Sequence, residues 1–413
     1  MERKLFTKNF TLLVLGQASS LFGNHILRLA LSMYVLEVTG SAAVFAGILS
    51  LSTIPTILLS PIGGILADRA DRRDIMVALD TLTGMSVLCA AVFLSGDNAV
   101  VVIGVLLVIL SVLGAFETPT VQACIPQMLA GDNIIKGNAV VNQVASISYL
   151  LAPLLGGILY SAVGLKPVMV ASVVCFFITA LFECFIKLGC QAKKFQGFQG
   201  NVLSMVKDDL SGSIRFIMKE RPDIMKMLLL AAFSRFFVMG VTLVGLPFLV
   251  RSVLSLDARA YGGAESALAV ATILGSIAAG LLTGKVRSGR LSYVLAAIGV
   301  CIIPAGVIFL FPSGVMIRYA VIVAAFCGMQ AAISIFSIFA VSMIQQDTPD
   351  ELIGKIMAYT SAVTLCAQPV GQMVYGALFD RFQENVYLVL IPSGIAVCAI
   401  GLLATGFFRK LTE

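Results

Sequence analysis

Charged residues are scarce in this chain of 413 residues: only 12% are Asp, Glu, Lys or Arg, whereas 59% are apolar. A soluble protein of this length needs many more charges to cover its surface, so the composition excludes an ordinary soluble domain. Apolar stretches of about 20 residues, long enough to cross a bilayer as helices, recur along nearly the whole chain. Short segments of alternating polarity, which a membrane barrel would need, do not occur. Because helices satisfy all their backbone polar groups in lipid, the sequence predicts an all-α membrane protein.

Residues that hold metals, redox centres or nucleotides are also scarce. The chain has a single histidine, and its nine cysteines form no CxxC pair. It contains no phosphate-binding loop, so we expect no metal, no cofactor and no direct use of ATP. These absences disfavour a membrane enzyme. The net charge of +6 would suggest a nucleic-acid partner in a soluble protein, but here the location of the charges matters more, and we expect none.

Twelve apolar segments follow one another, with one long polar stretch after the sixth. The first segment is too long for the apolar part of a signal peptide, so we expect it to be the first spanning helix. The polar stretch predicts a six-helix half at 1–188, a cytoplasmic linker at 189–222 and a second six-helix half at 223–413. The segments cover 10–36, 42–67, 75–95, 99–121, 139–162, 167–187, 226–250, 262–284, 291–311, 315–342, 356–379 and 386–408.

Lysine and arginine are distributed unevenly between the two sides of the predicted membrane. If the N-terminus is cytoplasmic, the cytoplasmic side contains 21 of the 28 basic residues. The other side contains five, and two more, Arg28 and Arg235, lie inside apolar segments. Because cytoplasmic loops carry an excess of Lys and Arg, we expect both termini in the cytoplasm.

Two pairs of segments repeat at a fixed offset of 216 residues. GGILADRADRRD, beginning at Gly63, aligns with AGLLTGKVRSGR, beginning at Ala279. LAPLLGGILY, with Pro153, aligns with AQPVGQMVYG, with Pro369. Each partner falls in the same helix of its half, so the halves form a parallel repeat, which in transporters places the substrate between the halves near the middle of the membrane.

The charge cluster GILADRADRRDI, from Gly64 to Ile75, follows the second segment. It resembles the signature loop of the major facilitator superfamily, G-x-L-A-D-R-x-G-R-R-x-I, with Asp71 where glycine is usual. LGQASSLFGNHILRLALSMYVLEVTGSA, DRADRRDIMVALD, AFETPTVQACIPQM and SISYLLAPLLGGILY look like the macrolide-efflux and siderophore-exporter branch of drug:proton antiporters. The resemblance covers the whole chain.

The resemblance implies a fold of twelve transmembrane helices in two six-helix halves and a secondary active transporter that works by alternating access. The expected activity is proton-coupled export of small amphipathic compounds, either macrolide-like drugs or siderophores. An uptake carrier or lysolipid transporter of the same fold is the alternative. We expect a monomer in the cell membrane, whose partners are the lipid bilayer, protons and a small-molecule substrate.

The charge cluster suits a cytoplasmic gate, because ion pairs at the membrane edge can form when a gate closes and be hydrated when it opens. The resemblance implies that Asp68 faces the start of the eleventh helix near Ile356, where the helix dipole favours a carboxylate. The arginines of the cluster can pair with Asp68, Asp71 or the end of the fourth helix. Solvated charges of an ordinary cytoplasmic turn are the alternative. The predicted gate residues are Gly64, Asp68, Arg69, Arg72 and Arg73.

Polar side chains recur at helical spacing inside several apolar segments. Residues 20, 24, 28 and 32 are each four apart and share one face of the first helix. Polar groups in a membrane are functional candidates, but they also join helices by hydrogen bonds, so both interpretations stay open. The predicted cavity residues are Asn24, Arg28, Asn142, Ser146, Arg235, Gln330, Thr364 and Gln368.

Three residues are candidates for proton coupling: Glu117, Asp80 and His25. A carboxylate in an apolar site favours its protonated form and can carry a proton. Both acids lie toward the cytoplasmic side of the N-terminal half, where pairing with Arg72 or Arg73 is the structural alternative.

Two other membrane acids have structural explanations. Glu183 stands four residues before Lys187, so we expect a local ion pair. Glu265 lies near the predicted outer surface, where we expect it to be solvated.

One element of the fifth segment is a candidate hinge: Pro153, Gly156 and Gly157. Proline removes a helical hydrogen bond and bends the helix, and glycine permits close approach of a neighbour. APLLGG is similar to the G-P-x-x-G-G element of antiporter-type members, with Ala152 in place of the first glycine. Simple helix packing is the alternative.

Overall fold

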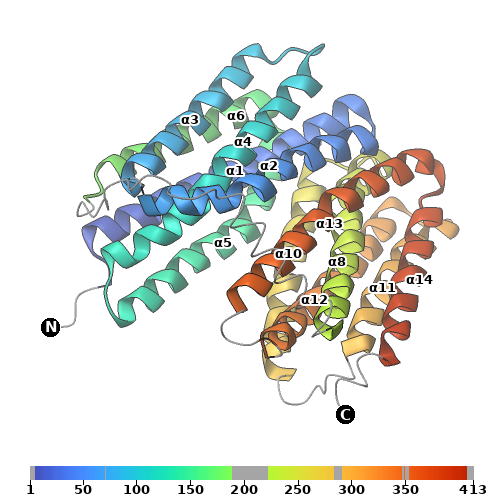
Figure 1. Ribbon diagram of the computed structural model, residues 1–413. Coiled ribbons are helices and arrows are strands. Elements are labelled where there is room, and N and C mark those ends of the chain that lie inside the picture. Colours follow the sequence, from blue (N-terminus) through green and yellow to red (C-terminus); the bar gives the residue numbers. More distant parts are fainter. Residues whose placement is uncertain are drawn as a thin grey trace. The chain divides into compact units, whose positions relative to one another are not determined.

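The computed structural model describes residues 5–69, 71–187, 222–282, 291–346, 348 and 353–406, and all regular elements within these ranges are helices (Figure 1). Ten helices of this part are long and apolar enough to cross a membrane. Two more, α13 with 29 residues and α14 with 17, correspond to the predicted eleventh and twelfth segments. The all-α membrane fold is therefore confirmed.

The helices of the first six segments extend past the predicted edges at several points. The helix α4 continues to Met128 and α5 begins at Asp132. The last turns of α4 are supported by packing, because Cys124 and Ile125 are buried in an apolar cluster with Phe10 of α1 and Met76 of α3. The bounds are α1 (Lys8–Thr39), α2 (Ala42–Arg69), α3 (Arg72–Phe93), α4 (Ala99–Met128), α5 (Asp132–Val163) and α6 (Leu165–Cys184).

The seventh segment is not a uniform α-helix. Two five-residue π-helical stretches follow α8, and the short α9 between them has Pro247 in its first turn. Proline has no N–H to donate, so the local hydrogen-bond pattern must change around it. The remaining elements are α8 (Pro222–Gly240), η2 (Val241–Gly245), α9 (Leu246–Phe248), η3 (Leu249–Val253), α10 (Ala258–Leu282), α11 (Leu291–Val307), η5 (Ile308–Leu310), α12 (Val315–Gln346), α13 (Ile353–Arg381), η6 (Gln383–Asn385) and α14 (Tyr387–Leu403).

The chain forms two compact units, which are described separately. The first contains Met1–Gly40, Ile48–Gly197 and Leu256–Ser266, and the second contains Ser41–Gly47, Phe198–Ser255 and Ala267–Glu413. Two short pieces thus group with the opposite half: the start of α2 belongs to the second unit, and the start of α10 belongs to the first.

Small residues allow the helices of the first unit to approach closely. The helix α1 packs against α5 and α6, and α3 packs against α4 and α6. A Cβ atom on Gly23 of α1 would lie 3.0 Å from the Cβ of Cys175 on α6. Thr179 of α6 donates its hydroxyl to the carbonyl of Gly16 at 3.1 Å, so small side chains and hydroxyls together join α1 to α6.

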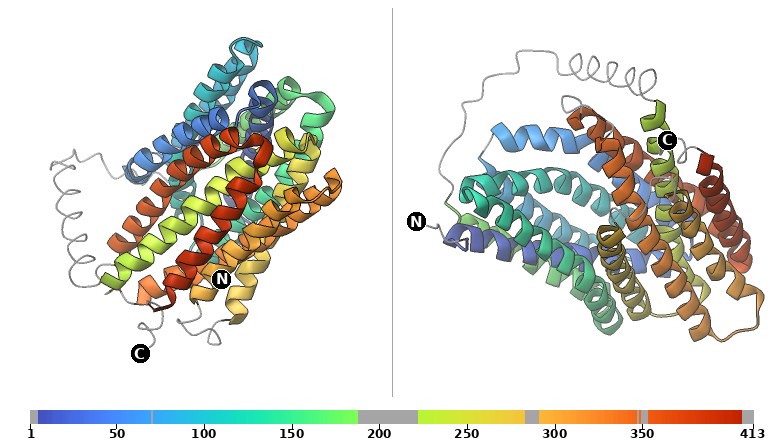
Figure 2. Two further views of the ribbon diagram at one scale, coloured as in Figure 1. Left: turned by 90° about the vertical axis from the view of Figure 1, so that its right-hand side faces the viewer. Right: turned by 90° about the horizontal axis from the view of Figure 1, so that it is seen from below.

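The second unit uses the same device with larger aromatic groups. The helix α14 packs against α11, and α13 lies beside α8 (Figures 1 and 2). Tyr375 of α13 is 1% exposed and covers Gly240 at the end of α8, where a Cβ atom would overlap its ring. Its hydroxyl donates to Ser393 of α14 at 2.6 Å, so α13 is joined to both α8 and α14.

Candidate functional site

A serine hydroxyl of the first unit lies between two carboxyl groups. Ser20 Oγ of α1 is 3.0 Å from Asp80 Oδ1 of α3 and 3.4 Å from Glu117 Oε1 of α4. Ser20 and Asp80 are buried, with 1% and 2% of their surfaces exposed. A hydroxyl has a single hydrogen, so Ser20 can donate to only one carboxylate at a time. Both contacts are hydrogen bonds together only when one carboxyl holds a proton and donates it to the serine oxygen.

A third carboxyl group adjoins this pair. Glu183 of α6 is 1% exposed and lies within hydrogen-bonding reach of Asp80. Among the described residues, no donor reaches Asp80 Oδ2 or Glu183 Oε2. The predicted pair between Glu183 and Lys187 is wrong, because α6 ends at Cys184 and the helical spacing of four does not extend to residue 187. Sequence reasoning missed this contact because helices far apart in the chain create it.

One guanidinium faces the carboxyl groups. Arg28 of α1 lies close enough to Glu117 for their charges to interact. Its Nε donates to Asn24 Oδ1 at 2.7 Å, one turn earlier on the same helix. The predicted stripe of α1 therefore places Ser20 next to both proton-coupling candidates, Asp80 and Glu117, and Arg28 next to Glu117. We call Ser20, Arg28, Asp80, Glu117 and Glu183 the carboxyl network.

His25 is involved in a different contact. Its ring packs edge-on against Tyr149 of α5, with 5.6 Å between ring centroids and 83° between planes.

Tyr261, at the start of α10, donates its hydroxyl to Glu265 one turn later. Glu265 is half-buried, so the expectation that it is merely solvated is wrong: a neighbouring phenol shields it.

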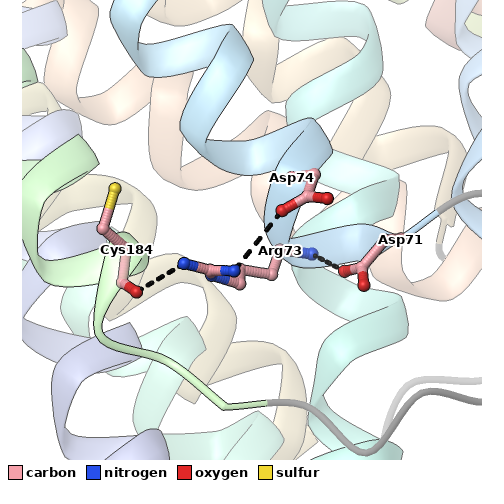
Figure 3. Close-up of polar contacts among 4 residues, drawn as sticks. All are labelled: Asp71, Arg73, Asp74 and Cys184. Atoms are coloured by element: carbon pink, nitrogen blue, oxygen red, sulfur yellow. Dashed lines mark hydrogen bonds and ion pairs between the residues drawn. The ribbon is translucent and has the colours of Figure 1, made fainter.

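Two arginines of the predicted gate bind backbone carbonyls of neighbouring helices. Arg72 donates to the carbonyl of Ala123 in α4 at 2.7 Å, and Arg73 donates to the carbonyl of Cys184, the last residue of α6, at 2.7 Å. Arg73 also lies 3.6 Å from Asp74 (Figure 3). Both arginines thus fasten the start of α3 to the C-terminal parts of α4 and α6 within the first unit.

Asp71, the position that departs from the family pattern, begins α3. Its side chain accepts a hydrogen bond from the backbone N–H of Arg73 at 3.0 Å and forms the N-cap of the helix (Figure 3). A carboxylate at an N-cap accepts a hydrogen bond from an otherwise free N–H group. Its negative charge is also stabilised by the positive end of the helix dipole. An acidic residue directly before a helix is a signal that the sequence contained. The surroundings of Gly64 and the side chains of Asp68 and Arg69 lie outside the described part of the structure.

The second unit contains a cavity of about 230 Å³ between α8, α12 and α13. Of the predicted cavity residues, Arg235 and Thr364 line it, and Gln368 accepts a hydrogen bond from Arg235 at 3.2 Å. Gln330 is half-buried outside the cavity lining, and no described donor reaches its Oε1. In the first unit, Asn142 and Ser146 are exposed on α5, and Ser146 donates to the Asn142 carbonyl at 2.9 Å.

The predicted hinge lies in close helix contacts of the first unit. Gly156 faces Ile26 of α1, whose Cα atom would be 3.2 Å from an added Cβ. A Cβ atom on Gly157 would overlap the carbonyl oxygen of Ala258 at the start of α10. Pro153 lies inside α5 and presents its carbonyl to Gly262. The three residues thus lie where α5 meets two neighbours, and hinge motion stays a prediction.

Comparison with known proteins agrees with this geometry. The sequence profile of the Major Facilitator Superfamily matches residues 13–368. Macrolide efflux protein A of Streptococcus pyogenes is 24% identical over 405 residues, covering 96% of this chain and 95% of that protein. Multidrug efflux pump Tap of Mycolicibacterium fortuitum is 23% identical over 405 residues, covering 95% and 93%.

Solved structures show the same fold at lower sequence similarity. The nucleoside transporter NupG superposes with a TM-score of 0.70 at 13% identity, covering 99% of this chain and 100% of that one. A bacterial homologue of the iron transporter ferroportin in the inward-facing state gives 0.70 at 16% identity, covering 98% of both chains. This chain is a multi-pass membrane protein and a transporter rather than an enzyme, and it belongs to the Major Facilitator Superfamily.

Proposed function

We propose that this protein exports small amphipathic compounds across the cell membrane in exchange for protons, as a monomer with both termini in the cytoplasm. The observation that carries the proposal is the contact of Ser20 with both Asp80 and Glu117. One hydroxyl hydrogen cannot serve two carboxylates, so the arrangement suits a pair that gains and loses a proton. Ionisable groups inside a membrane are costly and are typical of proton pathways.

Arg28 links the protonation of the carboxyl pair to the conformation of the protein. Loss of the proton leaves a net negative charge beside its guanidinium, and binding of the proton removes that charge. The strength of the Arg28–Glu117 interaction therefore changes with each proton. A transporter that alternates between two states needs such a differential interaction, because a ligand shifts an equilibrium only by its difference in affinity for the two states.

Export as the direction of transport is supported by two relatives, whose names describe macrolide efflux and multidrug efflux. Macrolide-like drugs or siderophores are the proposed substrates. Uptake, or transport of a lysolipid, is the second candidate. Transport in both orientations of reconstituted vesicles distinguishes these directions, because exchange against protons moves substrate uphill only toward the acidic side.

The test is efflux of a compound panel from a sensitive host, with and without a proton uncoupler, in wild type and in Glu117→Gln. Glutamine resembles a permanently protonated glutamate, so we expect loss of uphill efflux and retention of downhill exchange. Asp80→Asn is measured in parallel. Uphill efflux that persists in both variants and still collapses with uncoupler would place the proton site elsewhere. Uphill efflux that is insensitive to uncoupler in wild type would refute proton coupling.

A further inference from the structure

The cavity of the second unit has mainly apolar walls and one cationic group. Met239 of α8, Phe336 and Ile344 of α12 and Met357 of α13 contribute to its apolar lining. Arg235 of α8 supplies the charge. A guanidinium stays protonated in proteins, and a charge inside a membrane-spanning segment is costly unless a partner or water compensates it.

Arg235 has no negatively charged partner within the described part of the chain. Its guanidinium donates a hydrogen bond to Gln368 Oε1, a neutral acceptor, at 3.2 Å. Its Nε is buried and has no acceptor, and no carboxylate of the described residues forms an ion pair with it. Arg28, which also lies inside an apolar segment, differs because it faces Glu117.

The two threonine hydroxyls that line the cavity are engaged within α13, whereas Ser337 and Ser361 present further, uncharged hydroxyl groups to it. Thr360 donates to the carbonyl of Ile356 at 2.9 Å, and Thr364 donates to the carbonyl of Thr360 at 2.7 Å. Both hydroxyl hydrogens are therefore used within α13. The N–H groups of Arg235 that Gln368 leaves unused are the donors best suited to a ligand, and their planar fork matches the two oxygens of a carboxylate.

We propose that this cavity binds the carboxylate of an amphipathic organic anion, with Arg235 as its ligand and the apolar wall around the remainder of the molecule. The proposal narrows the substrate class of the exporter to carboxylate-bearing compounds, which siderophores can be and macrolides are not, so its relevance to transport rests on the proposed function. Binding itself does not depend on a gradient. A charge-assisted, bidentate contact in a largely apolar cavity should discriminate strongly between an acid and its neutral amide.

The experiment uses a tryptophan reporter, because the chain contains no tryptophan. Phe336→Trp in the purified full-length protein places a single fluorophore in the cavity wall. It is titrated with para-butylbenzoate and para-butylbenzamide, which have nearly the same shape and differ in charge. We expect the benzoate to bind at least about tenfold more tightly than the amide, which is about 1.4 kcal/mol.

Three further variants are made in the reporter background. Arg235→Gln should reduce the preference for the acid to about twofold or less while the amide still binds, and Arg235→Lys should keep part of the preference. Arg318→Gln is the matched control: it removes the same charge from the same unit at a residue outside the cavity lining, and should leave the preference unchanged.

Equal binding of acid and amide in the parent protein would overturn the proposal, as would a preference that survives Arg235→Gln. Tighter binding of para-butylbenzylamine than of the acid would also overturn it. If Arg235→Gln binds neither probe, the cavity has collapsed, and Arg235→Lys decides: preference for the acid supports the proposal and its absence refutes it. Efflux that is insensitive to uncoupler would refute proton coupling without affecting any of these binding results.

Discussion

Alanine at position 157 tests the contact between α5 and the start of α10. A Cβ atom on Gly157 would overlap the carbonyl oxygen of Ala258, which is a backbone atom and cannot rotate away. Gly262 faces the carbonyl of Pro153 in the same contact, and a Cβ there would also overlap it. We therefore predict that Gly157→Ala forces the two segments apart.

Two opposing free energies determine the size of the effect. Alanine stabilises a helix by about 0.8–1 kcal/mol relative to glycine, whereas overpacking a filled contact costs about 1–3 kcal/mol. Gly114 of α4 is the matched control, because no atom of a neighbouring described element lies within 4 Å of an added Cβ. Gly114→Ala should keep only the helix gain, so the two variants should differ in stability by about 1–3 kcal/mol.

Thermal unfolding of the purified protein in one detergent measures this difference, and efflux from cells measures its functional effect. We expect Gly157→Ala to melt below both wild type and Gly114→Ala, and to reduce efflux at equal expression. Equal melting temperatures of the two variants would refute the reasoning. Reduced efflux with a wild-type melting temperature would instead favour the hinge interpretation over simple packing.

Three other changes test single contacts. Ser20→Ala should reduce uphill efflux by about tenfold or more, because a hydrogen bond to a charged group is worth about 1.5–3 kcal/mol. Ser19→Ala is the control, since the Ser19 hydroxyl binds only a backbone carbonyl, and equal efflux rates of the two variants would contradict the prediction. Asp71→Ala should lose about 0.5–2 kcal/mol of stability with the N-cap of α3, whereas Asp71→Ser should retain most of it; identical melting of both variants and wild type would show that the cap is dispensable. Asp380 accepts hydrogen bonds from the hydroxyl of Ser41 and from backbone N–H groups at the start of α2, so Asp380→Asn should cost about 0.3–2 kcal/mol; an unchanged melting temperature would refute this role.

The fold could be predicted from composition and hydropathy because lipid permits few structures. Twelve apolar segments predicted the helices in their order, and the charge cluster predicted the family. Helix ends were less predictable: α4 runs on to Met128 because its last turns pack against α1 and α3 in an apolar cluster, a contact that no local sequence pattern reveals. The π-helical stretches on either side of Pro247 could not be predicted from the spacing of polar and apolar residues. Nearly all residues there are apolar, so a wider helical turn does not change the pattern.

The candidate site was only partly predictable. Asp80 and Glu117 could be named as proton-coupling candidates because acids in apolar segments are rare. Their common contact with Ser20 could not be found, since the three residues lie on α1, α3 and α4 and no sequence spacing relates them. Local spacing was misleading for Glu183, whose nearest basic neighbour in the sequence lies beyond the end of its helix.

The sequence by itself determined the class of the molecule, because the shortage of charge and the length of the apolar runs leave helices in a membrane as the physical solution. Local sequence also decides that α3 begins at Arg72 rather than at the predicted residue 75, because Asp71 caps that helix through a local hydrogen bond. Tertiary structure alone decided which polar groups are compensated. Arg28 and Arg235 occupy similar apolar sequences, yet packing places Glu117 beside the first and a cavity beside the second. Charges interact through space over a few ångströms, and that distance is set by how the helices pack.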